Sequence, residues 1–135
     1  MIIATERFEH IANGSASIRD MIARYTEVLW AEAQQIAACN AMHGASARLC
    51  RWLLQSSDRI GSNELPLIQE FLAQMLGVRR TTVNILAQGM QARGLISYRR
   101  GRIVLLDRKG LEECACDCYD IMHHEKLAPA LGVKL

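Results

Sequence analysis

The stretch from Pro66 to Arg93, PLIQEFLAQMLGVRRTTVNILAQGMQAR, decides the fold. Leu72 and Leu76 are spaced as the buried face of a first helix, which we expect to begin at the proline that opens the stretch. Gly77 is typical of a residue that ends a helix. A second helix is predicted over about 79–93. The sequence therefore predicts two helices that meet across a tight glycine turn.

The spacing within this stretch matches the requirements of a helix-turn-helix. The first helix must cross close to the second, so it needs a small residue in its middle, a turn residue that tolerates a positive φ, and apolar anchors afterwards. Ala73, Gly77 and Val83 occupy these three positions. The other inward positions are also apolar, at Leu72, Leu76, Val78 and Leu86. We therefore predict a DNA-reading helix-turn-helix, with a purely structural helical hairpin as the alternative.

Two short β-prone runs follow, over 95–99 and 102–106, on either side of Arg100-Gly101. This pattern predicts a β-hairpin, and a hairpin after a helix-turn-helix is the wing of a winged helix. Three arginines stand at its tip, at Arg99, Arg100 and Arg102. They suit contacts with a phosphate backbone beside the groove that the second helix enters.

Arginine is concentrated in the same part of the chain. The 135-residue sequence has a formal net charge of only +2, but residues 71–106 contain six arginines and no Asp or Glu. The segments before and after this stretch are both mildly acidic. A basic stretch without carboxylates is typical of a surface that contacts phosphates, and a solvated basic face is the alternative.

The outward face of the second helix carries groups that can read bases. Arg80 can form a bidentate pair with guanine, Asn84 can form one with adenine, and Thr81 or Ile85 can contact a thymine methyl group. The predicted base-reading residues are therefore Arg80, Thr81, Asn84 and Ile85. The predicted contacts with the DNA backbone are Ile68, Gln69, Arg79, Thr82, Arg99, Arg100 and Arg102.

A long helix is predicted upstream, from Ser17 to about Met42. Its apolar residues recur mostly at steps of three and four, and only Glu32 interrupts the stripe. The stripe consists of Ile18, Ile22, Tyr25, Leu29, Ile36 and Cys39. A lone helix of this length buries such a stripe most economically against a partner, which predicts a parallel homodimer through the first five of these residues. A core helix folded back on its own domain is the alternative.

Composition restricts the class of protein. Half of the residues are hydrophobic and 22% are charged, which is typical of a globular protein. No apolar run reaches the roughly 18 residues of a membrane span. Glu6 and Glu9 stand where a signal peptide would be uncharged, so we expect a cytoplasmic protein with no membrane partner. Five cysteines, an odd number, favour reduced thiols over a disulfide framework.

The cysteines near the end of the chain suggest a different function, a metal or redox sensor. The candidate ligands are Cys114, Cys116, Cys118, His123 and His124. Their one-residue spacing is unusual for zinc, and on a single helix over 111–122 only Cys114 and Cys118 share a face. We therefore expect no metal site and no cofactor. Paired carboxylates, a nucleophile with a nearby histidine and a glycine-rich phosphate loop are not recognisable, which argues against an enzyme.

Three stretches resemble the Crp/Fnr regulators: ARLCRWLL at 47–54, QEFLAQMLGVRRTTV at 69–83 and RGLI at 93–96. The resemblance covers about residues 17–113. In that family a sensory β-barrel binds an effector, a long helix pairs two subunits and a winged helix reads a two-fold DNA site. The resemblance implies a transcription regulator that binds double-stranded DNA as a homodimer, with RNA polymerase as a further partner to test.

The sequence departs from the family pattern in ways that change the expectations. The barrel is missing, except for its last residues over 2–13, so no effector site is carried over. Thr81 and Ile85 stand where better-known members have a glutamate and an arginine, so the preferred DNA sequence should differ. Ile68 replaces a hydroxyl residue that caps the first helix, which leaves backbone N–H groups for that contact. A modulator that pairs with a full-length relative is the alternative function.

These observations predict a mainly α fold (small α+β), with a long dimerisation helix followed by a winged helix-turn-helix. The expected boundaries are a sensory-domain remnant or linker over 1–16, the dimerisation helix over 17–43, the winged helix-turn-helix over 44–113, and a C-terminal helix and tail over 114–135.

Overall fold

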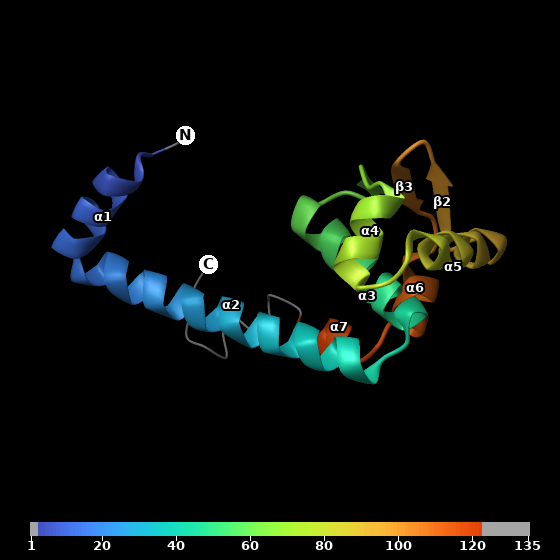
Figure 1. Ribbon diagram of the computed structural model, residues 1–135, viewed down its shortest axis with the longest axis horizontal. Coiled ribbons are helices and arrows are strands. Elements are labelled where there is room, and N and C mark those ends of the chain that lie inside the picture. The colour runs from blue at the N-terminus through green and yellow to red at the C-terminus, as the bar shows by residue number, and fades with distance from the viewer. Residues whose placement is uncertain (1–2, 123–135) are drawn as a thin grey trace.

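The computed structural model describes residues 3–122, which form a mainly α fold with one small sheet (Figure 1). The helices are α1 (Thr5–Gly14), α2 (Ala16–Met42), α3 (Ala45–Ile60), α4 (Gln69–Leu76), α5 (Arg80–Ala92), α6 (Arg108–Cys114) and α7 (Cys118–Ile121). The strands are β1 (Glu64–Leu65), β2 (Ile96–Arg99) and β3 (Arg102–Leu105). The predicted fold class is confirmed. No helix within this described part combines the length and the apolar character that a membrane crossing requires.

The long helix α2 extends away from the rest of the fold (Figure 1). It has 27 residues, which corresponds to about 40 Å at 1.5 Å per residue. It begins after Ser15, whose side chain accepts a hydrogen bond from the Ile18 amide at 3.4 Å. At the other end, His43 and Gly44 have extended backbones and connect α2 to α3. The long helix predicted from Ser17 is therefore present and starts one residue earlier.

Residues 5–14, within the region predicted as a sensory-domain remnant or linker, form a helix. Helix α1 folds back at the far end of α2, where Ala12 is buried and the Arg19 side chain donates to the carbonyl oxygen of Ala12 at 3.4 Å. Phe8 and Ile11 remain exposed. Phe8, Ile11 and Ala12 recur at helical spacing, so the pattern of this short helix was present in the sequence and was missed.

Helix α3 is at the centre of the winged-helix unit, by which we mean residues 45–114. Its buried face carries Leu49, Leu53 and Leu54, none of them more than 1% exposed. They belong to a core to which every later element contributes, through Leu65, Leu72, Val83, Ile96, Ile103 and Leu111, among others. The unit therefore has a hydrophobic core of its own.

The helix-turn-helix is formed as predicted around Gly77. Gly77 has φ +62°, and the Val78 amide donates to the Ala73 carbonyl at 3.1 Å, which closes the end of α4. Ala73 is buried where α4 meets α5. The expected start of this helix was wrong, because α4 begins at Gln69 rather than at Pro66. The residue before the proline, Leu65, is paired in a strand, so the chain needs three more residues before it turns into the helix.

The wing is a hairpin of β2 and β3, as predicted. Tyr98 pairs with Ile103, and the loop consists of Arg100 and Gly101 with φ values of +48° and +75°. Two central residues with positive φ form the type of turn that matches the twist of a two-residue hairpin. The short strand β1 was not predicted. It pairs with β3, so the sheet has the order β1-β3-β2.

The single helix predicted over 111–122 is wrong. The chain forms α6 and α7 instead, and Ala115 between them has an extended backbone. The break lets the Tyr119 hydroxyl donate to Asp58 Oδ2 at 2.9 Å and accept from Arg108 Nη2 at 2.8 Å. Burial, and then the hydrogen bond with Asp58, raise the pKa of Tyr119 to about 12. His123 and His124 lie outside the described residues.

Two glycines give opposite expectations for stability. A Cβ atom on Gly110 would lie 2.6 Å from Leu95 Cδ2 and would also collide with the Asp107 side chain that caps α6. We expect Gly110→Ala to lower the free energy of unfolding by about 1–3 kcal/mol, which is the usual cost of overpacking. Gly89→Ala is the control, because a Cβ atom added there, in α5, would meet no atom within 4 Å apart from its own helix backbone. It should raise stability by about 0.5–1 kcal/mol.

Denaturant titration followed by helical circular dichroism would measure both changes. A Gly110→Ala variant as stable as the original chain would show that α6 does not pack against Leu95 in the way described.

Candidate nucleic-acid interface

Helix α5 packs on the core through one face and presents the opposite face to solvent. Val83, Ala87 and Met90 follow the helical period and are no more than 3% exposed. The predicted base-reading residues occupy the other side: Arg80, Thr81, Asn84 and Ile85 are all exposed. Ile85, a large apolar side chain, is 67% exposed. The structure therefore brings all four predicted reading residues to one accessible face.

Three polar side chains on this face are connected across the two helices. Gln69 Nε2, at the start of α4, donates to Asn84 Oδ1 at 3.2 Å. Arg80 Nε donates to Gln69 Oε1 at 3.4 Å. These contacts hold Arg80 and Asn84 next to Gln69, which was predicted to contact the DNA backbone. Both hydrogen bonds are exposed to solvent, so Gln69, Arg80 and Asn84 can exchange them for hydrogen bonds with a ligand.

Both helices of the motif begin without a side-chain cap. Ile68 precedes α4 and Arg79 precedes α5, and neither offers a side-chain hydrogen bond to the first turn. The first amides of a helix then need another acceptor, and phosphate oxygen is a common one. Arg79 is exposed beside one of these helix ends, and Thr82 is half-buried in the first turn of α5. The positions predicted to contact phosphates thus lie at two free helix N-termini.

The wing tip lies against the start of α4. A Cβ atom on Gly101 would be 3.1 Å from Ile68 Cγ2, so the hairpin loop packs directly on this side chain. Arg99 and Arg100 are exposed at the tip. Arg102 differs from them, because it forms a salt bridge with Glu64 of β1. Of the three wing arginines, two are available to a phosphate and the third is engaged within the sheet.

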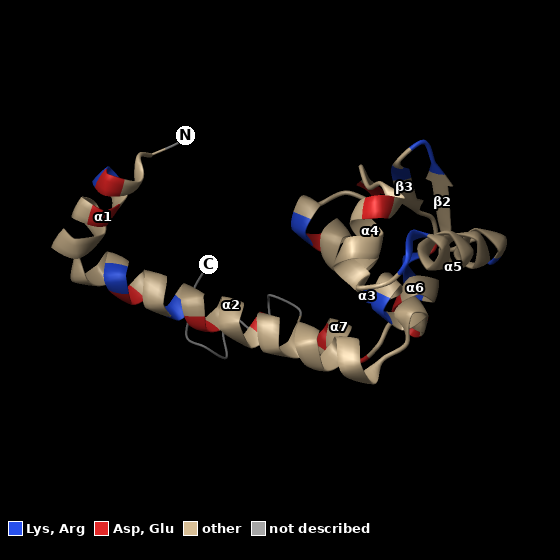
Figure 2. Ribbon diagram, in the orientation of Figure 1, with Lys and Arg blue, Asp and Glu red and all other residues tan. Residues whose placement is uncertain are grey.

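Four exposed arginines of this surface have no acidic partner in the described part of the chain. Within residues 3–122, Arg79, Arg80, Arg99 and Arg100 form no salt bridge, whereas Arg24, Arg59, Arg102 and Arg108 each pair with a carboxylate. Figure 2 shows basic residues at the hairpin loop and between α4 and α5, whereas acidic and basic residues alternate along α2. Unpaired arginines grouped on one face form a surface of positive potential.

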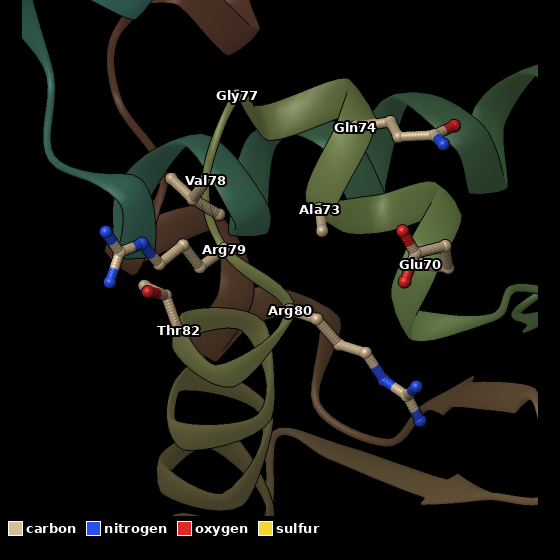
Figure 3. A pocket seen from close by; sticks show the side chains of 8 residues that line it. All are labelled: Glu70, Ala73, Gln74, Gly77, Val78, Arg79, Arg80 and Thr82. Atoms are coloured by element: carbon tan, nitrogen blue, oxygen red, sulfur yellow. The ribbon is translucent and has the colours of Figure 1, made fainter.

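A shallow hollow between α4 and α5 contains a residue that the sequence analysis missed. It is lined by Glu70, Ala73, Gln74, Gly77, Val78, Arg79, Arg80 and Thr82 (Figure 3). Arg79 and Arg80 extend to opposite sides of it in this view, and Glu70 is the acidic residue in the lining. Glu70 directly precedes the stretch without carboxylates, so counting charges along the chain placed it outside the basic region. Its position on α4 brings it back into the site.

The predicted dimerisation stripe is accessible along part of α2. Tyr25, Leu29 and Ile36 are 50%, 46% and 37% exposed, whereas Ile18 and Ile22 are half-buried. A neighbouring face of the same helix is covered and carries Val28, Glu32 and Cys39.

Cys39 was wrongly included in the stripe, because its Sγ atom contacts Cys116 Sγ of the same chain at 3.5 Å. Glu32, which seemed to interrupt the stripe, pairs with Arg59 at 3.2 Å. One face of α2 therefore packs against its own chain, and a neighbouring face is exposed to solvent.

The comparisons with known proteins agree with this geometry. The sequence profile of the Crp-like helix-turn-helix domain matches residues 47–114. No curated protein sequence matches the chain significantly. Among solved structures, a protein described as a transcriptional regulator of the Crp/Fnr family from Eubacterium rectale is similar with 26% identity and a TM-score of 0.65, over 84% of this chain and 52% of that one.

Two further structures share the fold at lower identity. TTHB099, a transcriptional regulator of the CRP family from Thermus thermophilus, has 23% identity and a TM-score of 0.69, over 75% of this chain and 55% of its own. A CooA variant from Carboxydothermus hydrogenoformans has 22% identity and a TM-score of 0.68, over 80% of this chain and 53% of its own. The chain thus spans about half the length of these structures.

The profile match covers half of the chain and includes the helix-turn-helix and the wing. It agrees with the turn at Gly77 and with the hairpin that follows α5. The chain therefore belongs to the Crp/Fnr family of transcription regulators, through its Crp-like helix-turn-helix domain.

Proposed function

We propose that this chain binds a specific, pseudo-palindromic DNA sequence as a homodimer and thereby regulates transcription. The observation that carries the proposal is the single exposed face that combines the reading helix α5, two uncapped helix N-termini and the unpaired arginines of the wing. The four predicted reading residues on this face are exposed, and none of them belongs to the hydrophobic core. A surface with this combination suits a duplex, whose backbone is anionic and whose major groove admits a helix.

The proposed roles follow from position and chemistry. Arg80, Thr81 and Asn84 enter the major groove and contact base edges, where a guanidinium fork and an amide distinguish guanine and adenine. Ile85 contacts a thymine methyl group. The backbone contacts come from Gln69, Arg79, Thr82, Arg99 and Arg100, together with the amides after Ile68. Arg102 makes this contact only if DNA displaces its salt bridge with Glu64.

Dimerisation is proposed through the open stripe of α2. Tyr25, Leu29 and Ile36 leave apolar surface exposed along a helix of about 40 Å, which a second copy would cover in a parallel seam. A two-fold pair of chains would place two α5 helices in successive major grooves about one helical turn apart. This arrangement accounts for the expected two-fold symmetry of the site.

Selection of bound sequences from random duplex DNA, at about 0.15 M salt, tests the function directly. The proposal requires an enriched two-fold motif bound by two chains. Salt-sensitive binding without a motif would contradict sequence-specific regulation. Absence of binding by the chain alone, together with exchange into a full-length relative, would instead support the modulator alternative.

The dimer seam gives a separate prediction. Leu29→Asp should convert the protein to a monomer at micromolar concentration, because two carboxylates would face each other in a desolvated seam at a cost of several kcal/mol. Gln34→Asp is the matched control, since Gln34 is exposed on the opposite side of α2 and the same charge there should leave the dimer intact. Sedimentation velocity would measure both. Equal behaviour of the two variants would exclude the stripe as the interface.

A further inference from the structure

Three cysteines converge where α2 meets the winged-helix unit. Cys39 lies near the end of α2, Cys116 lies between α6 and α7, and Cys118 is the first residue of α7. All three are buried, and their sulfur atoms lie within 4.8 Å of one another. Figure 1 shows α7 beside the last part of α2. The three thiols therefore come together from parts of the chain that are more than seventy residues apart.

Their spacing is close to that of thiolates around one metal ion. Cys39 Sγ and Cys116 Sγ are 3.5 Å apart. With a metal–sulfur distance of about 2.3 Å and tetrahedral angles, two thiolates lie about 3.8 Å apart. The observed 3.5 Å is slightly below this value, and none of the three separations exceeds 4.8 Å. Binding of a metal would require shifts of less than about an ångström for each sulfur.

The surroundings of the thiols are rich in sulfur. The buried residues that pack together here are Cys39, Cys116, Cys118 and Met122, with Ala47 partly buried against them, and they form a cluster distinct from the main core. Thiolate and thioether donors select soft metal ions. Gln35 Nε2 donates to Cys118 Sγ at 3.2 Å, which is the kind of outer hydrogen bond that orients a metal ligand. The cluster thus offers three thiols, a thioether and one hydrogen-bond donor.

A buried positive charge stands beside this cluster. Arg51 is 2% exposed, donates to Gln55 Oε1 at 2.7 Å and lies 3.7 Å from Met122 Sδ. Within the described part of the chain it forms no salt bridge, and its Nε atom has no hydrogen-bond partner. A buried guanidinium without a counter-charge is costly. A divalent ion held by three thiolates has a net charge of −1 and would supply a counter-charge.

We propose that Cys39, Cys116 and Cys118 bind one soft, thiophilic metal ion per chain and that this ion joins α2 to the winged-helix unit. Each thiol releases its proton to solvent as its sulfur bonds to the metal.

The ion would control the angle between the dimer helix and the DNA-reading face. Only His43 and Gly44 separate α2 from α3. Cys39 precedes this connection in α2, whereas Cys116 and Cys118 belong to the α6–α7 segment that follows the wing, so a metal bound to all three would bridge the connection. A metal bond across it restricts rotation about the connection. This regulatory step rests on the proposed function, because the angle sets the separation of the two α5 helices in a dimer. Metal binding is therefore expected to change the affinity for the operator.

Titration of the reduced, full-length chain with Cd²⁺ tests the site without DNA. The expected result is a thiolate-to-cadmium charge-transfer band that saturates at one ion per chain. Cys39→Ser, Cys116→Ser and Cys118→Ser should each weaken binding by at least about tenfold, since even loss of an outer-shell partner commonly has that effect. Cys39→Ala, checked by circular dichroism, serves as a second variant in case the serine disturbs folding.

Cys114→Ser is the matched control. Cys114 is in the same segment but half-buried, and its Sγ atom accepts a hydrogen bond from Arg93 Nη2 at 3.0 Å, outside the cluster. This variant should bind Cd²⁺ as the original chain does. Absence of saturable binding by the original chain, or equal binding by Cys39→Ser and Cys114→Ser, would overturn the site.

Operator binding with and without Cd²⁺ tests the regulatory step. A change in affinity of about fivefold or more in the original chain, absent in Cys39→Ser, would support it. An unchanged affinity in a chain that does bind the metal would overturn the coupling. If the chain binds no DNA under either condition, the proposed function fails, whereas the cadmium titration still decides the metal site.

Discussion

Arg80→Ala is expected to lower the affinity for the selected operator by about 5- to 150-fold per half-site, whereas binding to random duplex DNA should change little. A bidentate contact between arginine and guanine contributes roughly 1–3 kcal/mol of discrimination. Arg80 is exposed at the first position of α5, and its hydrogen bond with the Gln69 side chain, at 3.4 Å, is weak and exchangeable. Competition between labelled operator and random DNA at fixed salt would measure the ratio. Arg80→Lys, which keeps the charge but loses the fork, should show most of the same loss.

Arg100→Ala is the comparison that separates reading from positioning. Arg100 is at the wing tip, exposed and without an acidic partner in the described part of the chain, so its proposed contact is a phosphate. Its loss should weaken operator and random DNA alike and reduce the salt slope by about one. If Arg80→Ala and Arg100→Ala lowered specific and random binding by the same factors, this division of roles would be incorrect.

Leu53→Ala is expected to lower the free energy of unfolding by about 2–5 kcal/mol. Leu53 is fully buried in the middle of α3, in contact with the core that supports the helix-turn-helix and the sheet. Truncation removes buried apolar surface and leaves a cavity in a well-packed region, and both effects are unfavourable. Urea titration at neutral pH would measure the change. Because the reading helix is held by the same core, operator affinity at elevated temperature should fall with stability.

Leu106→Ala is the control for the core. Leu106 follows β3 and is 60% exposed, so the same truncation there should change stability by no more than about 0.5 kcal/mol. A small effect at Leu53 would contradict the position of α3 at the centre of the core.

The parts of the fold that the sequence predicted well are those that depend on local chemistry. Gly77 ends a helix because the backbone has a positive φ there, which glycine adopts easily. Arg100 and Gly101 also have positive φ, which is what a tight two-residue hairpin loop requires. The apolar periods of α2 and α5 are likewise visible in a single sequence. The apolar residues of α5 identify its buried face, and the four predicted reading residues lie on the opposite, exposed face.

The features that were missed depend on contacts between distant residues. The two-residue strand β1 has no period of its own and exists because β3 pairs with it. The break between α6 and α7 follows from the packing of Cys116 and Tyr119, which local propensity does not report. Cys39 was included in the apolar stripe of α2, because its packing partner, Cys116, is 77 residues away in the sequence and could not be identified from it. Glu70 was missed because only the packing of α4 against α5 brings it close to the residues of the site.

The pairing of β1 with β3 has a consequence for how the wing meets DNA. A hairpin of two strands alone is marginally stable in water, but here a third strand and the Arg102–Glu64 salt bridge support it from the side. The loop also rests on Ile68 at the start of α4. The wing and the reading helix therefore form one preorganised surface. Little conformational entropy remains to be lost when they engage a duplex together, so more of the contact energy is expressed as affinity.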